Sequence, residues 1–490
     1  MNAAMGRRMR MLRAISLSLV LGIFVIQFAL LRQLRMPVWF SRGIFFAIDP
    51  LIFLQHLAVT HKLLLYAMVA LIPLAATLVL GRFFCGWVCP FGAIHEFLSW
   101  IGGKRQKPAS RPDKKLLRIK YLILATVVVA ALAGTTLAGW LDPLALLSRS
   151  AAAAIEPAAR SYLPQRGLVR HPIQPVLIGA IFLLVIFLNI WRRRFFCNTL
   201  CPLGALFGLL GRSSLLRLEA TSDCTECREC TSRCTYNGGP SRGHLKSECD
   251  LCFACVADCS RECVDVKFGV LAKTDVGLNP GRRQLLGTAA VGLSVAALCR
   301  ASGVGRPDSK VGHNFLRPPG AISEREFLSR CARCGQCVAV CPTNYIQPGL
   351  LEAGLAGLWA PVLNAQTGYC EFECSLCTRV CPSGAIEPLT LGRKKVFKVG
   401  TATIDRSRCL RYVEGGNCSV CIENCPIPSK ALRERPEEAM PGRKGRAREL
   451  YVVADACTGC GICEYRCPVP NGSGVRVVAE NEDREAVTVS

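Results

Sequence analysis

Cysteine is the residue type that decides what chemistry this chain can do. Its 490 residues include 30 cysteines and only six histidines. Most of the cysteines follow the spacing C-x2-C-x2-C-x3-C, whose thiolates ligate iron–sulfur clusters. Disulfide scaffolds are small secreted domains, and zinc sites use four-cysteine knuckles of a different spacing. The pattern therefore predicts [4Fe–4S] clusters, which transfer single electrons.

Two regular quartets lie within residues 211–280, where the chain becomes polar and charged. In two-cluster ferredoxins the fourth cysteine of each run ligates the other cluster. We therefore predict two [4Fe–4S] sites, one formed by Cys224, Cys227, Cys230 and Cys259 and the other by Cys249, Cys252, Cys255 and Cys234. Thr235 and Ser260 replace the proline that usually follows the fourth cysteine. Cys263 is a spare and is expected to be a bystander.

Four further quartets follow between residues 301 and 490, two of them with a lengthened first gap. The same exchange of fourth cysteines within neighbouring pairs predicts four more [4Fe–4S] sites. Their ligands are Cys331, Cys334, Cys337 with Cys381; Cys370, Cys374, Cys377 with Cys341; Cys409, Cys418, Cys421 with Cys467; and Cys457, Cys460, Cys463 with Cys425. Metal ligation would supply much of the folding energy of this segment. The chain is thus expected to hold six clusters.

The elements that must position these sites begin with a membrane portion, because 51% of the residues are hydrophobic. Four apolar runs, at about 12–31, 63–80, 121–138 and 172–191, are long enough to span hydrocarbon as helices. The net charge of +25 comes largely from Lys and Arg beside these runs, where they set topology. We therefore expect a membrane-embedded protein and no nucleic-acid partner. Both ends of residues 1–210 are predicted to face the cytoplasm.

An internal repeat divides this membrane portion. Each half reads apolar run, Asp-Pro-Leu, apolar run and then C-x3-C-P, and the flanking residues of the two motifs are nearly identical. Two equivalent hairpins would bring four thiols together at the cytoplasmic surface: Cys85, Cys89, Cys197 and Cys201. They could ligate an additional metal or cluster, or cycle as dithiols. The alternative is a structural turn with buried thiols.

The Asp-Pro-Leu motifs supply the only candidate catalytic groups, because clusters themselves are conductors. Asp49 and Asp142 are predicted at the outer face, where quinol would lose protons to an acidic residue. Alternatively, each Asp-Pro pair simply starts a turn. A transmembrane haem is disfavoured, since the histidines of this portion lie at span ends or in loops.

Arg282 and Arg283 precede a short apolar run, residues 285–299, and resemble a twin-arginine export signal placed in mid-chain. The alternative is a fifth hydrophobic helix with a basic flank. Clusters are assembled in the cytoplasm, so a cluster protein bound for the far side is best exported folded. Ala301-Ser302-Gly303 could be a cleavage site, which would release the tail, or the tail stays tethered.

The expected fold is an α-helical membrane domain of four spans plus a fifth crossing segment, with α+β bacterial-type ferredoxin modules on both sides. Its predicted parts are a membrane domain (1–210), a cytoplasmic two-cluster module (211–280), the crossing helix (281–300) and a periplasmic four-cluster domain (301–490).

With these motifs in view, residues 1–280 resemble NapH-like membrane ferredoxins, the membrane component of a quinol dehydrogenase. Residues 281–490 resemble NapG-like polyferredoxins exported by a twin-arginine route, and the MauN and MauM pair is similar. The resemblance implies a fusion in the bacterial inner membrane that takes electrons from the quinol pool. It implies a periplasmic acceptor such as a cytochrome or a nitrate reductase system. The missing prolines and the internal signal depart from the family pattern.

A different class of function uses the same residues. Paired C-x3-C-P motifs also resemble assembly, maturation or regulatory factors that reduce a metal centre or thiols of a client enzyme. A third interpretation is a membrane-anchored electron store. Steady quinol oxidation with cluster reduction would distinguish an electron-transfer component, acting as a quinol dehydrogenase, from both alternatives.

Overall fold

The computed structural model describes residues 3–31, 43–61, 65–102, 114–155, 173–225, 227, 229–230, 234, 240, 246–269, 281–302, 315–414, 417–439, 448–470 and 472–483. The chain forms two compact units. Unit 1 comprises Met1–Leu30, Gly43–Ser148 and Gly179–Ala297, and unit 2 comprises Leu31–Arg42, Arg149–Ile178 and Leu298–Ser490. Residues 211–280 therefore belong with the N-terminal helices, and part of the second repeat belongs with the C-terminal segment. The Gly415-Gly416 insert of the third quartet and residues 303–314 of the linker lie outside the described residues.

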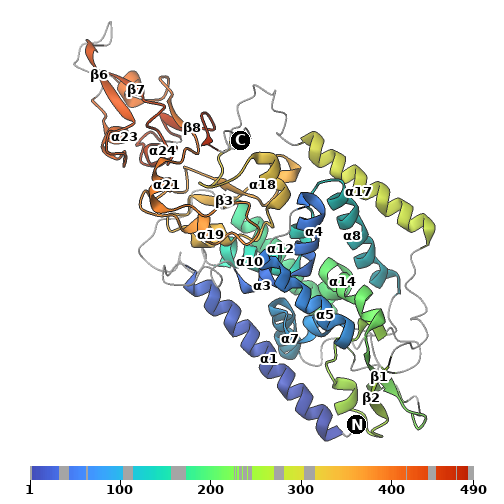
Figure 1. Ribbon diagram of the computed structural model, residues 1–490. Helices are drawn as coiled ribbons and strands as arrows, with labels where there is room; N and C mark the ends of the chain where they lie inside the picture. The colour runs from blue at the N-terminus through green and yellow to red at the C-terminus, as the bar shows by residue number, and fades with distance from the viewer. Residues whose placement is uncertain are drawn as a thin grey trace. The chain divides into compact units, whose positions relative to one another are not determined.

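Helices build the described part of residues 1–210, and their order follows the internal repeat (Figure 1). The first helix, α1 (Ala3–Leu30), supplies the opening apolar run of the first repeat. That repeat continues with α3 (Ile44–Ala47), α4 (Pro50–Thr60), the 3-10 turn η1 (Leu65–Ala70), α5 (Leu71–Leu80), α6 (Phe83–Trp87) and α7 (Pro90–Gly102). The second contains α8 (Lys114–Leu132), α9 (Ala138–Leu141), α10 (Pro143–Ser150) with the π turn η3 (Ala151–Ile155), α12 (Ile173–Trp191), α13 (Phe195–Thr199) and α14 (Pro202–Leu210).

Four of these helices start in the same way, with a proline at the first helical position and a capping side chain directly before it. The backbone N–H at the first helical position has no intrahelical partner, so proline, which lacks this N–H, loses no hydrogen bond there. Asp49 accepts a hydrogen bond from the Leu51 amide at 2.9 Å, and Asp142 accepts one from the Ala145 amide at 2.8 Å. The sulfurs of Cys89 and Cys201 accept from glycine amides in the same way. The motif residues are therefore held at helix N-termini.

The first ferredoxin module is a small antiparallel ribbon of β1 (Leu216–Ala220) and β2 (Val264–Phe268), with the short helix α16 (Ala254–Ala257). Its buried core includes Trp87 from the first C-x3-C-P motif, packed with Phe253 and Val256. The Trp87 indole N–H donates to the Leu251 carbonyl at 3.1 Å. Because the core is shared, this module packs with the helices of unit 1.

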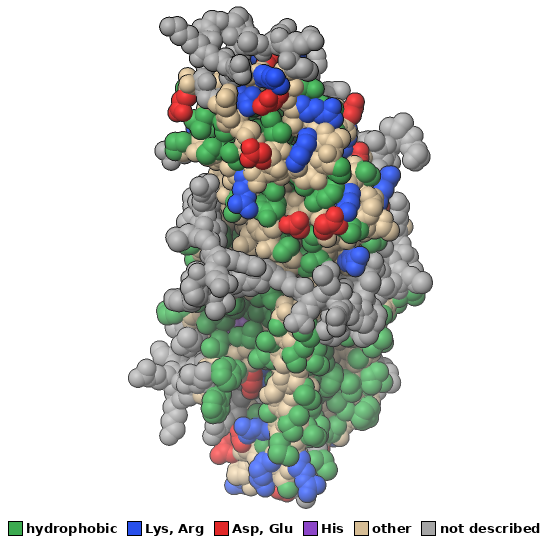
Figure 2. Space-filling model, turned by 90° about the vertical axis from the view of Figure 1, so that its left-hand side faces the viewer, with side chains coloured by type: hydrophobic (Ala, Val, Ile, Leu, Met, Phe, Trp, Pro, Cys, Tyr) green, Lys and Arg blue, Asp and Glu red, His purple; other side chains and the backbone are tan. Residues whose placement is uncertain are grey.

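Two helices are long and apolar enough to cross a membrane within the described residues, namely α1 and α17 (Arg282–Ser302). Apolar helices of shorter length occur at Pro50–Thr60, Met68–Leu80, Pro143–Ile155 and Gln174–Asn189. The 285–299 run is thus part of a 21-residue helix, long enough to span. Large apolar side chains face outward along α1, for example Met11 at 60% and Leu19 at 61% exposure. Figure 2 shows one face of the molecule, with apolar side chains gathered over part of it and Lys and Arg side chains beside them.

Unit 2 is assembled from two-stranded antiparallel sheets and short helices, the architecture of ferredoxin modules. Its sheets pair β3 (Ile346–Pro348) with β4 (Pro361–Leu363), β5 (Thr401–Ile404) with β8 (Val475–Val478), and β6 (Leu432–Ala439) with β7 (Arg448–Val452). Its helices include α18 (Glu324–Arg330), α19 (Gln336–Val340), α20 (Leu376–Arg379), α21 (Leu391–Val396), α22 (Leu410–Val413), α23 (Val420–Glu423) and α24 (Ile462–Tyr465). Cysteines supply half of one buried core, together with residues such as Leu432 and Val475.

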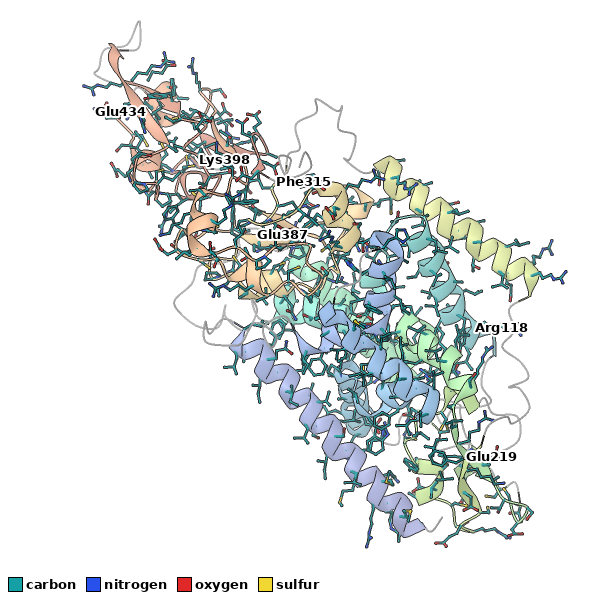
Figure 3. All side chains as sticks on the ribbon, in the orientation of Figure 1. Arg118, Glu219, Phe315, Glu387, Lys398 and Glu434 are labelled. Carbon is teal, nitrogen blue, oxygen red and sulfur yellow. The ribbon has the colours of Figure 1, made fainter. Side chains whose placement is uncertain are left out.

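A buried arginine ties the start of the described part of unit 2 to its first module. Arg317 is 1% exposed, and its guanidinium donates to both carboxylate oxygens of Glu324 at 2.6 and 3.0 Å. It also donates to the Pro361 carbonyl at 2.7 Å. The rings of Phe315, labelled in Figure 3, and Phe327 lie against it. Such a bidentate pair is directional, so it orients α18 on the β3–β4 sheet.

Candidate cluster sites and thiol tetrad

The cysteines of unit 2 gather in four groups. Site A comprises Cys331, Cys334, Cys337 and Cys381; site B comprises Cys341, Cys370, Cys374 and Cys377; site C comprises Cys409, Cys418, Cys421 and Cys467; site D comprises Cys425, Cys457, Cys460 and Cys463. Within each site the fourth cysteine, which comes from the neighbouring quartet, interacts electrostatically with another cysteine of the site. Cys331 interacts in this way with Cys381, and Cys374 with Cys341. Cys409 interacts with Cys467, and Cys460 with Cys425. The structure thus brings together the four predicted sets.

Three of these sites surround hollows in the protein. The hollows at sites A, B and D are each lined by all four cysteines of the site, with about 400, 350 and 280 Å³ of atom-free space. Within the described residues no three Cys, His, Asp or Glu side chains are close enough to hold a single metal ion. The all-thiol donor sets around these hollows fit multi-iron clusters.

The first module groups its cysteines less simply. Cys252 and Cys255 interact electrostatically with Cys234, which places the exchanged fourth cysteine with its predicted partners. In the other set, the Cys259 sulfur lies 3.6 Å from the sulfur of Cys263. Cys263 is also hydrogen-bonded to Cys224 and is 6% exposed. Cys227 is exposed. The spare cysteine is therefore in the middle of the predicted site, whereas the sequence suggested a bystander.

The four thiols of the C-x3-C-P motifs lie together inside unit 1, and we call them the thiol tetrad: Cys85, Cys89, Cys197 and Cys201. Cys89 interacts electrostatically with Cys85 and Cys197, and Cys201 interacts with the same two. Burial raises the pKa of the Cys197 thiol to about 11, although the cations of Arg194, Arg82 and Lys120 oppose the shift. These cations would favour the thiolate form that ligates metals.

The repeat places an arginine of each half across the motif of the other half. A side chain at Gly204 would meet the Arg82 guanidinium at 3.1 Å, and one at Gly92 would meet that of Arg194 at 3.9 Å. Both arginines are fully buried. Arg194 pairs with Glu96. The thiol tetrad is thus enclosed by a pseudo-symmetric pair of cations, which lowers the energy of negative charge there.

Glu248 connects this cationic frame to the first ferredoxin module. It is fully buried and pairs with both Arg82 and Lys120. The Tyr121 hydroxyl donates to its other oxygen at 2.5 Å. Cation partners lower the pKa of Glu248 against the opposing effect of burial. Glu248 directly precedes the cluster ligand Cys249, so one buried ion-pair network reaches both the thiol tetrad and a cluster site.

The sequence analysis did not single out Glu248, Lys120 or Tyr121. A weak sequence signal existed for Lys120 and Tyr121, a cation and a phenol at the start of an apolar run. The only sequence signal for Glu248 was its position directly before the predicted ligand Cys249. Their convergence depends on the packing of α8 against residues 246–250, which spacing does not reveal.

Asp49 and Asp142 lie side by side, both with no exposed surface. Burial and then the neighbouring Asp142 carboxyl group raise the pKa of Asp49 well above its usual range. Asp142 also raises the pKa of the Cys201 thiol, after burial and the neighbouring thiols. Whether these aspartates and the thiols face opposite sides of a membrane, as the sequence predicts, depends on the topology of the chain and stays a prediction.

These sites define an iron–sulfur electron-transfer protein of the bacterial ferredoxin type. The sequence pattern of the 4Fe-4S binding domain family matches residues 63–108, 173–219 and 327–346. The first two matches contain the C-x3-C-P motifs, and the third contains three site A cysteines and Cys341. The prediction of [4Fe–4S] ferredoxin-type chemistry is thereby confirmed.

Among curated relatives, the methylamine utilization ferredoxin-type protein MauM of Methylobacillus flagellatus is 33% identical over 39% of this chain and 80% of its own length. The ferredoxin-type protein NapG of Escherichia coli is 38% identical over 38% of this chain and 81% of its own length. MauM of Methylorubrum extorquens is 34% identical over 41% and 90%. The chain belongs to this MauM/NapG family of ferredoxin-type proteins. No solved structure matches it.

Proposed function

We propose that this chain is a fusion of a NapH-like membrane ferredoxin with a NapG-like polyferredoxin, and that it transfers electrons from the quinol pool to a periplasmic acceptor. Six [4Fe–4S] clusters at the predicted cysteine sets conduct the electrons. A seventh metal centre or cluster, held by the thiol tetrad, receives them from quinol. The acceptor is a soluble redox protein, such as a cytochrome or a reductase of nitrate respiration.

The observation that carries this proposal is the fully buried pair of Asp49 and Asp142, of which Asp142 lies within electrostatic range of Cys201. Quinol oxidation releases two electrons and two protons, so a site for it needs a redox centre beside a proton acceptor. The second carboxylate of the pair can accept a proton, and the buried cations Arg82 and Arg194 favour the electron-accepting centre. The repeat supplies one aspartate, one arginine and two cysteines from each half.

The outward apolar surface of the helices supports a membrane location. Exposed large apolar residues on α12 include Leu183 at 66% and Phe187 at 64%, and on α17 they include Leu286 at 72%. Such outward-facing apolar side chains fit a lipid environment. The proposed topology has four crossings in residues 1–210 and a fifth in α17, which starts at Arg282 as a twin-arginine signal. Unit 2 then lies in the periplasm.

Quinol oxidation is tested with the full-length protein in liposomes, using a menaquinol or ubiquinol analogue and following cluster reduction by EPR. The wild type is expected to show reduced clusters, and Asp142→Asn to lose at least about 100-fold in rate, the lower end of general acid–base effects. Asp455→Asn, at a side chain that is fully exposed, serves as the matched control. Absence of reduction by any quinol in the wild type would refute the proposal. It would favour the assembly-factor alternative, in which the thiols reduce a client.

The location of unit 2 is tested by protease treatment of spheroplasts. Cleavage within residues 315–483 of intact spheroplasts is expected, while the first module stays protected until lysis. Protection of unit 2 would overturn the topology.

A further inference from the structure

We propose that the four cluster sites of unit 2 form a single unbranched electron path in the order A, B, D, C. The cluster of the third quartet, and not that of the last, is then the far end of the path. This inference rests on the proposed electron-transfer function and concerns residues of unit 2 alone. The order of the quartets along the chain would instead suggest A, B, C, D.

Two of the three connections lie inside the modules that exchange their fourth cysteines. Cys337 of site A interacts electrostatically with Cys377 of site B. Cys463 of site D interacts with Cys421 of site C. Sites C and D also share one buried core, which contains cysteines of both. Each module therefore forms a closely spaced pair, A with B and C with D.

The connection between the two modules joins site B to site D. The amide of Cys370 donates a hydrogen bond of 2.7 Å to the carbonyl of Cys460. The two sulfurs also interact electrostatically. Cys370 of site B and Cys460 of site D are thus joined directly by a backbone hydrogen bond. Because the rate of electron tunnelling falls steeply with distance, this junction decides the order in which the modules are connected.

Tyr345 fills the junction. Its side chain is 1% exposed, and its hydroxyl donates to the Gly459 carbonyl at 3.3 Å. It interacts electrostatically with Cys370 of site B and with Cys460 of site D. Gly461, at φ +78°, faces the ring, and a Cβ there would come within 2.6 Å of the tyrosine hydroxyl oxygen. The absence of a side chain at Gly461 is what allows the site D loop to approach site B this closely.

Site A is the end that receives electrons in this proposal, because it packs against Arg149, where the part of the second repeat that belongs to unit 2 begins. A Cβ at Gly335 would lie 3.0 Å from the Cα of Arg149. Arg149 donates to the Arg333 carbonyl at 3.4 Å, and its guanidinium lies 5.2 Å from the ring centroid of Trp359. At the other end, Cys418 and Cys467 of site C are partly exposed, which delivery to a partner requires, although cysteines of site B are partly exposed as well.

The order is tested by EPR of the purified full-length protein reduced with dithionite, because neighbouring reduced clusters broaden and split each other's signals. Cys421→Ser, which removes a site C ligand, is expected to leave the signals of A, B and D mutually coupled. Cys463→Ser, at site D, is expected to leave the A–B pair coupled and to abolish the coupling of C to any neighbour. An isolated site D signal in Cys421→Ser would overturn the proposal. Since no quinol is involved, failure of quinol oxidation leaves this test intact.

A second variant keeps every ligand in place and so answers the concern that a ligand variant fails to fold. Gly461→Ala is expected to retain wild-type iron content and to lose the B–D coupling, because its methyl group pushes the site D loop away from Tyr345. Gly384→Ala is the matched control, since Gly384 has a similar φ of +68° but open space where its Cβ would lie. Unchanged coupling in Gly461→Ala, with all iron present, would refute the junction.

Discussion

Replacing Glu248 with glutamine should destabilise unit 1 severely, although the two side chains have nearly the same shape. Glu248 has no exposed surface, and neither do its cationic partners Arg82 and Lys120. The amide can still accept hydrogen bonds, including that of Tyr121. It cannot balance two buried positive charges. The expected effect is therefore electrostatic and not a loss of packing.

The magnitude follows from the burial of the whole network. Removing one partner of a buried ion pair costs about 3–5 kcal/mol, because the remaining charge is left in a medium of low dielectric constant. For a domain of this size each kcal/mol lowers Tm by about 2–4 °C, so we expect a fall of roughly 6–20 °C. Cys249 follows Glu248 in the chain, so cluster occupancy of the first module should fall with it.

The measurement is thermal unfolding of the full-length protein in detergent, together with iron content per chain. Glu219→Gln is the control: Glu219, labelled in Figure 3, pairs with Lys267 at 3.8 Å on the ribbon of the same module. Lys267 is 60% exposed, and surface pairs contribute about 0–1 kcal/mol. In Glu248→Gln, a second change of Lys120→Met should restore part of the stability, because it removes one unbalanced charge.

A Tm for Glu248→Gln within about 4 °C of the wild type, the largest shift expected of the surface pair, would contradict the reasoning. It would mean that water or a movement of Arg82 compensates the charge. Loss of stability without rescue by Lys120→Met would point to packing instead.

Three further predictions follow from other contacts. The Cys263 sulfur lies 3.6 Å from that of Cys259, so Cys263 should replace Cys259 as a ligand. Cys259→Ser should therefore keep both clusters of the first module, and the double change of Cys259 and Cys263 to serine should lose one. Loss of iron in the single variant would show that Cys263 cannot replace Cys259. Arg317→Lys should lower the stability of unit 2 by about 2–4 kcal/mol in thermal unfolding. Lysine cannot form the bidentate pair with Glu324 and also reach the Pro361 carbonyl. An unchanged stability would contradict the assigned role of Arg317. Removal of iron by oxidation and chelation should unfold the segment around sites C and D, because cysteines supply half of its buried core. The unfolding should appear as a loss of far-UV circular dichroism. Retention of the signal would show that the apolar residues of the core suffice.

Local spacing was sufficient to predict which cysteines gather. A C-x2-C-x2-C-x3-C run places its first three thiols on one tight loop, and exchange of the fourth with the neighbouring run follows the pattern of two-cluster ferredoxins. The groupings of sites A to D, such as Cys331 with Cys381, could therefore be predicted without coordinates. The same holds for the pairing of the C-x3-C-P motifs, because a sequence repeat predicts equivalent positions.

The tertiary structure decided what depends on packing between distant segments. The spacing of residues along the chain does not predict that Asp49 lies beside Asp142 or that Glu248 pairs with two buried cations. It also does not predict that Cys263 lies beside a predicted cluster ligand. It does not contain the order of the cluster path either. Those relations arise because buried charges and carboxyl groups must find partners across the fold, and because glycine at position 461 lets two modules approach. The amino-acid sequence by itself determined which atoms can hold iron, whereas the packing of the chain determined which of those sites are neighbours.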